Sequence, residues 1–151
     1  PGLKQAQEMG IKDIRFIGEQ GADSPKTSEI AGTAAEGFVI LTNLDRDDPR
    51  PVVQEYLKAY RDRHKIEPDM VGATAYDAFM IIIDAMKTAG SVEGKKVRDA
   101  IAANKDDDGL TGIITGFDAA GEVIKPVQLQ EIKDGKFHHF GIVSDPELVK
   151  P

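Results

Sequence analysis

The segment from Met70 to Ala89 constrains the fold most, because its residue pattern predicts a long helix that is apolar on most of its sides. Its polar positions form only a narrow stripe: Thr74, Asp77, Asp84 and Thr88. A helix with so wide an apolar surface packs against protein on two or more sides. Its longest apolar run, residues 79–83, is far too short to cross a membrane. We therefore expect a fold that covers this helix on at least two sides.

The residues near the start of the chain alternate between helix and strand patterns. The predicted order is helix at 3–9, strand at 14–17, helix at 25–31 and strand at 38–42. Ser24 provides an N-cap for the second of these helices, and a proline follows it at the first helical position. The second strand is an unbroken apolar run, typical of a strand buried on both faces. This alternation predicts an α/β fold with parallel strands.

Polar turn formers at residues 43–50 mark the best candidate for a linker or a crossing between domains. Helical patterns follow this stretch, and the first has one apolar stripe over residues 52–60. From residue 109 the pattern returns to strands, with Asp134-Gly135 as a strong two-residue hairpin signal. Three segments result: 1–43 (α/β), 44–108 (a crossing followed by helices) and 109–151 (returning strands and a C-terminal tail).

The charge balance and the lack of cysteine exclude several kinds of function. The chain has 19 basic and 26 acidic residues and a net charge of −7, which disfavours general binding to nucleic acid. The absence of cysteine removes disulfides, thiolate catalysis and cysteine-ligated metals together. No recognisable signal peptide opens the sequence, so any export signal is expected outside it.

The polar clusters of the sequence match no catalytic or metal-binding motif. Asp45, Asp47 and Asp48 lack the ligand spacing of a calcium loop, and we interpret them as a solvated turn. His138 and His139 are adjacent on a predicted strand and should point to opposite faces, which makes a poor chelating pair. The sequence also lacks a nucleophile elbow and a phosphate loop. We therefore expect a protein that is not an enzyme, with no catalytic residue, no metal and no cofactor.

Four stretches, taken in order, resemble the family of branched-chain amino-acid binding proteins that serve ABC importers. The resemblance covers nearly the whole chain, and its most specific marks are YDA in a long apolar helix, then FD-x-x-G and KDGK. Gly116 looks like one residue more than the family has, and we expect a β-bulge there. The stretches are KQAQEMGIKDIRFIGEQGADSP at 4–25, AGTAAEGFVILTN at 31–43, YLKAYRDRHKIEPDMVGATAYDAFMIIIDAMKTAG at 56–90 and GLTGIITGFDAAGEVIKPVQLQEIKDGKF at 109–137.

The resemblance implies part of a type I periplasmic-binding-protein fold, whose two lobes close on a solute about a hinge. Residues 1–43 and about 109–145 would form the second lobe, and the helices of 51–104 would pack on a first lobe that these residues do not include. The chain would then match the C-terminal portion of the family. Without its first lobe it would expose a large apolar surface. We expect self-association, for example by swapping of these helices, or a place in a longer chain.

The resemblance also implies where a solute binds. The loop after the first strand contains Glu19, Gln20, Gly21 and Asp23, and family members often place an acidic side chain there to meet an α-ammonium group. Gln20 stands at the matching position, so either the solute is not an ordinary α-amino acid or Glu19 or Asp23 takes this role. A solvated loop is the alternative. Val71 matches a position that lines the solute side chain, and a simple core role is its alternative.

The function implied is capture of a small amino acid or related solute between two lobes and its delivery to an ABC permease. The intact protein would be periplasmic or tethered outside a Gram-positive membrane. A ligand-sensing regulator or receptor domain on the same fold is the alternative. An upstream signal peptide and a neighbouring permease would favour transport, and a fused kinase or DNA-binding segment would favour sensing.

Overall fold

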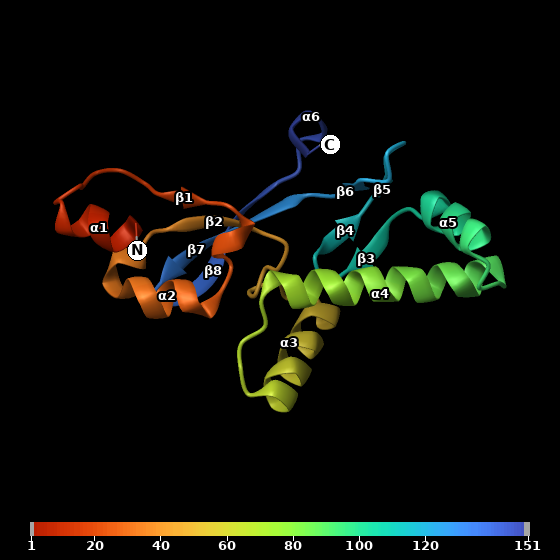
Figure 1. Ribbon diagram of the computed structural model, residues 1–151, viewed down its shortest axis with the longest axis horizontal. Coiled ribbons are helices and arrows are strands. Elements are labelled where there is room, and N and C mark those ends of the chain that lie inside the picture. Colours follow the sequence, from red (N-terminus) through yellow and green to blue (C-terminus); the bar gives the residue numbers. More distant parts are fainter. Residues whose placement is uncertain (1, 150–151) are drawn as a thin grey trace.

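The computed structural model describes residues 2–149 and has two halves joined by crossing segments (Figure 1). The sheet half carries short helices, and the helical half is built on the long helix α4 (Figure 1). The helices are α1 (Gly2–Glu8), α2 (Pro25–Ala31), α3 (Pro51–His64), α4 (Met70–Ala89), α5 (Gly94–Ala103) and α6 (Pro146–Val149), with 3-10 turns η1 (Gln20–Ala22) and η2 (Gly32–Ala35). The strands are β1 (Ile17–Gly18), β2 (Val39–Thr42), β3 (Asp107–Gly109), β4 (Gly112–Ile114), β5 (Gly116–Phe117), β6 (Val123–Ile124), β7 (Val127–Lys133) and β8 (Lys136–Val143).

The sheet half has four strands in the order β1-β2-β7-β8. β1 and β2 run parallel, as the helix–strand alternation predicts, whereas β7 pairs antiparallel with both β2 and β8. β7 and β8 meet at the predicted turn, where Asp134 and Gly135 have positive φ angles of 49° and 71°. These angles suit the two-residue turn that matches strand twist in a hairpin. The last strands thus return to the sheet begun by the first two, and the predicted α/β class is confirmed.

The strands between residues 107 and 124 do not join this sheet, although we expected strands from residue 109 onward to return to it. β3 pairs with β4, and β5 pairs with β6, in two separate antiparallel ladders. Buried Asp77 on α4 explains the difference, because its carboxylate accepts backbone N–H bonds from Leu110 and Thr111, each 2.8 Å long. The turn between β3 and β4 is therefore held on α4 and away from the sheet.

The bulge expected at Gly116 is also absent from the ladders of residues 2–149. β4 ends at Ile114 and β5 begins at Gly116, so the chain changes pairing partner at this point. Gly116 has a φ of 152°, a conformation that glycine adopts more readily than other residues. The register irregularity lies instead between Leu129 and Gln130, where β7 pairs with β8.

Two separate clusters of buried apolar side chains stabilise the two halves. The first cluster packs α2 and η2 on the sheet, and its members are Ala31, Ala35, Ile40, Ile132 and Phe137. The second packs α3 and α4 against the start of the β3–β4 turn, and its members are Leu44, Val53, Leu57, Ala73 and Leu110. The crossing at residues 43–50 lies between them, and its Leu44 belongs to the second cluster. Each half therefore has a core of its own.

Helix α4 leaves much of its apolar surface uncovered. Val71 and Phe79 are 66% and 64% exposed, and Tyr76 and Ile82 are also exposed. The sequence predicts a helix covered on at least two sides, and α3, α5 and the β3–β4 turn cover only part of it (Figure 1). This uncovered face agrees with the expectation that the helices of residues 51–104 pack on a further lobe. Among the helices of residues 2–149, none combines the length and hydropathy needed to cross a bilayer.

We predict that Leu57→Ala lowers the free energy of unfolding by about 2–5 kcal/mol, because Leu57 is fully buried in the helical half. Leu148→Ala is the matched control, since Leu148 is 71% exposed on α6 and its truncation should change stability by about 0.5 kcal/mol or less. Urea unfolding followed by circular dichroism measures both. Equal urea midpoints for the two variants would contradict a core at Leu57.

Candidate ligand-binding site

The loop of residues 19–23 leaves the carboxyl end of β1, next to the carboxyl end of its parallel neighbour β2. This edge of an α/β sheet is where ligands usually bind. The loop folds into the single turn η1, and Ser24 then caps α2 by accepting a bond from the Lys26 backbone N–H. Both the cap and the helix end at Ala31 agree with the sequence prediction.

Three of the predicted site residues in this loop are exposed: Glu19, Gln20 and Gly21. Within residues 2–149, the side chains of Glu19 and Gln20 have no hydrogen-bond or ion-pair partner. They are therefore free to meet a solute. Asp23, the fourth candidate, lies in a different environment.

Asp23 is buried, with 4% of its surface exposed. Its Oδ1 lies 2.5 Å from Arg46 Nη2, and its Oδ2 accepts a bond from the Thr42 hydroxyl. Both bonds lie inside the protein, and the Asp23 side chain is fully buried. A direct contact of Asp23 with a solute ammonium stays a prediction, and it would require the solute to reach this buried carboxylate. Among the carboxylates proposed for that role, Glu19 is the exposed one.

Arg46, in the crossing, organises a buried polar network that the sequence analysis missed. Its Nη1 donates to Gln130 Oε1 at 2.8 Å, and its Nη2 donates to the Pro68 carbonyl at 3.0 Å. Its guanidinium carbon also lies 4.7 Å from the centre of the Phe137 ring, within range of a cation–π contact. The available sequence signal was a single arginine between aspartates, two residues after the core residue Leu44.

The aspartates of the crossing form only in part the solvated turn that we expected, because Asp47 is exposed whereas Asp45 is buried. Asp45 is only 6% exposed, because it accepts a 3.0 Å bond from Gln130 Nε2 and lies 2.5 Å from His139 Nδ1. Asp47 Oδ2 accepts the His139 backbone N–H at 2.8 Å and lies 3.1 Å from His138 Nδ1. Both histidines therefore contact the crossing, although the sequence predicts opposite faces. Asp47 lies at the outer edge of β8, where it accepts a backbone N–H, and side chains from either face of an edge strand can reach such a position.

Val71 lies in the first turn of α4, which Asp69 caps by accepting a 3.0 Å bond from the Gly72 backbone N–H. Since Val71 is 66% exposed, it is not a core residue of this chain. The Arg46 contacts bring the start of α4 near the predicted loop, because Nη2 bonds to both Asp23 and Pro68. One nitrogen atom thus joins two predicted site segments that are far apart in sequence.

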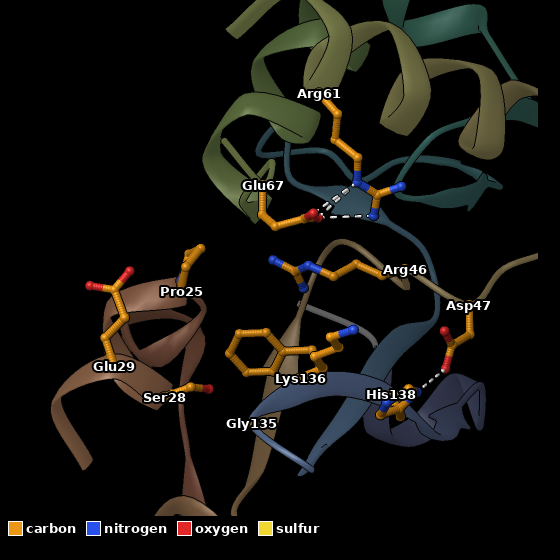
Figure 2. Close-up of a pocket in the computed structure, with 11 residues that line it drawn as sticks. Pro25, Ser28, Glu29, Arg46, Asp47, Arg61, Glu67, Gly135, Lys136 and His138 are labelled. Atoms are coloured by element: carbon orange, nitrogen blue, oxygen red, sulfur yellow. Dashed lines mark hydrogen bonds and ion pairs between the residues drawn. The ribbon is translucent and has the colours of Figure 1, made fainter. Parts of the chain in front are cut away.

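A cavity of about 490 Å³ opens beside Arg46, between α2, the crossing, the end of α3 and the β7–β8 turn (Figure 2). Figure 2 shows Arg46 extending toward the Arg61–Glu67 ion pair, whose side chains lie 2.9 Å apart. None of Glu19, Gln20, Gly21 and Val71 lines this cavity. It is therefore a space next to Arg46, distinct from the predicted solute loop. Residues 2–149 contain no cluster of histidine and carboxylate groups suited to a metal ion.

Lys125 lies where the chain passes from β6 to β7, and its pKa is shifted strongly from the ordinary value of lysine. Its Nζ donates to Thr111 Oγ1 at 2.6 Å, beside the residues that Asp77 holds. Burial lowers the pKa of Lys125 from 10.5 to about 8, and the charge of Asp77 only partly opposes this. At neutral pH the folded protein therefore contains a charged Lys125 ammonium group whose burial lowers the stability of the fold.

We predict that the free energy of unfolding rises between about pH 8 and 9.5. The Lys125 pKa is about 8 in the folded chain and 10.5 without burial. The unfolded chain therefore binds more protons in this range, which makes stability increase with pH. The full effect up to pH 10.5 is on the order of 3 kcal/mol. Urea unfolding at several pH values measures it, and Lys125→Met should flatten the rise.

Lys95→Met, which changes an exposed lysine on α5, is the control and should leave the pH dependence intact. The range stops at pH 9.5 because burial raises the pKa of Tyr56 to about 12, and this shift lowers stability above pH 10. A rise of equal size in the Lys125→Met variant would contradict the assignment.

Comparison with known proteins identifies relatives of this chain. Residues 1–136 match the family described as periplasmic binding protein. A leucine-, isoleucine-, valine-, threonine- and alanine-binding protein of Pseudomonas aeruginosa is 30% identical over 122 residues, which are 80% of this chain and 31% of that protein.

Solved structures agree with this match. The leucine-binding protein LivK of Thermotoga maritima has a TM-score of 0.83 at 29% identity, over 96% of this chain and 41% of that chain. LivJ of Streptococcus pneumoniae, in complex with isoleucine, has a TM-score of 0.80 at 26% identity, over 93% of this chain and 40% of that chain. The chain thus spans less than half of the length of these relatives and matches part of the type I periplasmic-binding-protein fold. It belongs to the periplasmic binding protein family, whose members are non-enzymatic binding proteins.

Proposed function

We propose that this chain forms the second lobe and hinge side of an extracytoplasmic solute-binding protein that serves an ABC importer. The observation that carries this proposal is that Arg46 Nη2 bonds both to Asp23, which follows the exposed residues 19–21, and to Pro68, which precedes the exposed start of α4. Two exposed segments at one sheet edge suit a site that a further lobe closes. Binding would then stabilise the closed arrangement without any bond chemistry.

The proposed solute is a small amino acid or a close analogue. Glu19 has an exposed carboxylate that can meet an ammonium group, and Gln20 has an amide that can both donate and accept hydrogen bonds. Val71 has an exposed apolar side chain that suits the aliphatic part of such a solute. The relatives named for leucine, isoleucine and valine binding support this class.

The proposed partners are a first lobe and a membrane permease. The uncovered face of α4, with Val71, Tyr76, Phe79 and Ile82, is apolar, and a packed lobe would cover it. An isolated chain would cover the same face by self-association, for example by swapping helices with a second copy. The family and its relatives support delivery to an ABC permease from the periplasm or from outside a Gram-positive membrane.

We predict that a complete protein containing this chain binds L-leucine and that Glu19→Gln weakens this binding about 10- to 100-fold. This range corresponds to the loss of one hydrogen bond to a charged group. The keto acid 4-methyl-2-oxopentanoate, which keeps the leucine side chain but lacks the ammonium, should bind both variants equally. Isothermal titration calorimetry measures the four affinities.

Glu29→Gln on α2 is the matched control, because Glu29 is an exposed carboxylate outside the loop. An equal loss for both ligands in the Glu19→Gln variant would show that Glu19 does not meet the ammonium. If neither L-leucine nor the keto acid binds the wild-type protein, the proposed solute class is wrong.

We also predict that the 151-residue chain alone sediments as a dimer or larger species and that Phe79→Asp shifts it toward monomer. Phe79 is 64% exposed on the uncovered face of α4, so a carboxylate there should oppose association without disturbing a core. Ile30→Asp is the control, since Ile30 is 52% exposed on α2 of the other half. A wild-type chain that sediments at its monomer mass of 16.4 kDa would contradict this prediction.

A further inference from the structure

We propose that Arg46 is a positioning residue that sets the angle between the sheet half and the helical half, and through it the geometry of the solute site. This inference rests on the proposed function. It starts from one atom: Arg46 Nη2 lies 2.5 Å from Asp23 Oδ1 and 3.0 Å from the Pro68 carbonyl oxygen. Asp23 closes the predicted solute loop, and Pro68 lies three residues before Val71.

The contacts of Arg46 are divided unequally between the two halves. The Arg46 side chain contacts Asp23, Gln130 and Phe137, which all belong to the sheet half. Within residues 2–149, the Pro68 carbonyl is its one hydrogen-bond partner in the helical half, and the Arg46 backbone carbonyl accepts a separate 3.3 Å bond from Gln54 Nε2 of α3. The charge of Arg46 is thus paired entirely within the sheet half. The side-chain bond to Pro68 can break or reform while the charge remains paired.

Burial makes this arrangement rigid on the side of the sheet. The Arg46 side chain is 8% exposed and that of Asp23 is fully buried, so neither can exchange its partner for water without a large cost. The planar guanidinium also fixes the directions of its donors, so its position on Asp23 and Gln130 determines where Nη2 points. The helical half therefore meets a fixed donor at Pro68, which is itself fully buried.

The cavity beside Arg46 leaves room for the two halves to move. Figure 2 shows Arg46 between Lys136 of the sheet half and the Arg61–Glu67 pair. The cavity that these residues line has a volume of about 490 Å³. A rotation about the crossing would change the distance from Arg46 to the segment of Arg61 and Pro68 without forcing side chains into a packed core. Arg46 thus holds the helical half in one orientation through its bond to Pro68, while its own position is fixed by the sheet half.

The test measures the angle between the halves in the complete protein that contains this chain. Spin labels are placed on cysteines introduced at Lys26 of α2 and Lys58 of α3, whose side chains are 73% and 80% exposed. Pulsed electron paramagnetic resonance gives the distance distribution between the labels, without ligand and with L-leucine as the probe. Thermal unfolding of each variant reports on folding separately.

Two variants separate positioning from folding. Arg46→Lys keeps a charge for Asp23 but cannot reach Asp23, Gln130 and Pro68 at once, because lysine lacks the rigid fork of donors. The double variant Asp23→Leu with Arg46→Met replaces the buried pair by apolar side chains, a change that often leaves stability intact. Both should fold, and both should show a broader distance distribution than the wild type in the absence of ligand.

The affinity for L-leucine should fall about tenfold in both variants, as expected if the binding-competent arrangement drops to roughly one tenth of the population. Arg98→Met, which removes an exposed arginine on α5, should change neither readout. A wild-type distance distribution in either folded variant would overturn the proposal. The ligand-free distribution needs no solute, so it tests Arg46 even if L-leucine fails to bind and the proposed function is wrong.

Discussion

The buried ion pair between Asp23 and Arg46 is the interaction on which the arrangement of the two halves depends. A charge removed from water must have a partner, so the loop after β1 and the crossing cannot separate without exposing or stranding one of the two. Thr42 and Gln130 complete the bonding of the pair from β2 and β7. The predicted solute loop and the crossing are therefore parts of a single polar unit.

Around this polar unit, the chain divides its apolar side chains between two cores. A single core would make the halves one rigid body, whereas two cores with a hydrogen-bonded crossing between them permit relative motion. The exposed face of α4 fits the same arrangement, because this long apolar helix keeps Val71 and Phe79 exposed although α3 and α5 pack on other parts of it. Membership of the periplasmic binding protein family fits both features.

Much of the fold could be predicted because its signals are local. The Ser24 cap, the end of α2 at Ala31 and the Asp134-Gly135 turn each depend on neighbouring residues alone. The position of the β3–β4 ladder apart from the main sheet could not be predicted in this way, because its turn is held by Asp77, more than thirty residues away on α4. Resemblance to a known family extended the prediction to the solute loop, where local pattern shows only polar residues.

The sequence by itself determined the helices, most strands, the α/β class and the family. Only the tertiary structure decided which carboxylates near the site are free: Glu19 is exposed, whereas Asp23 and Asp45 are buried against Arg46, Gln130 and His139. The physical reason is that a carboxylate has the same chemistry wherever it stands in the sequence. Its availability depends on burial and on partners that distant segments bring to it.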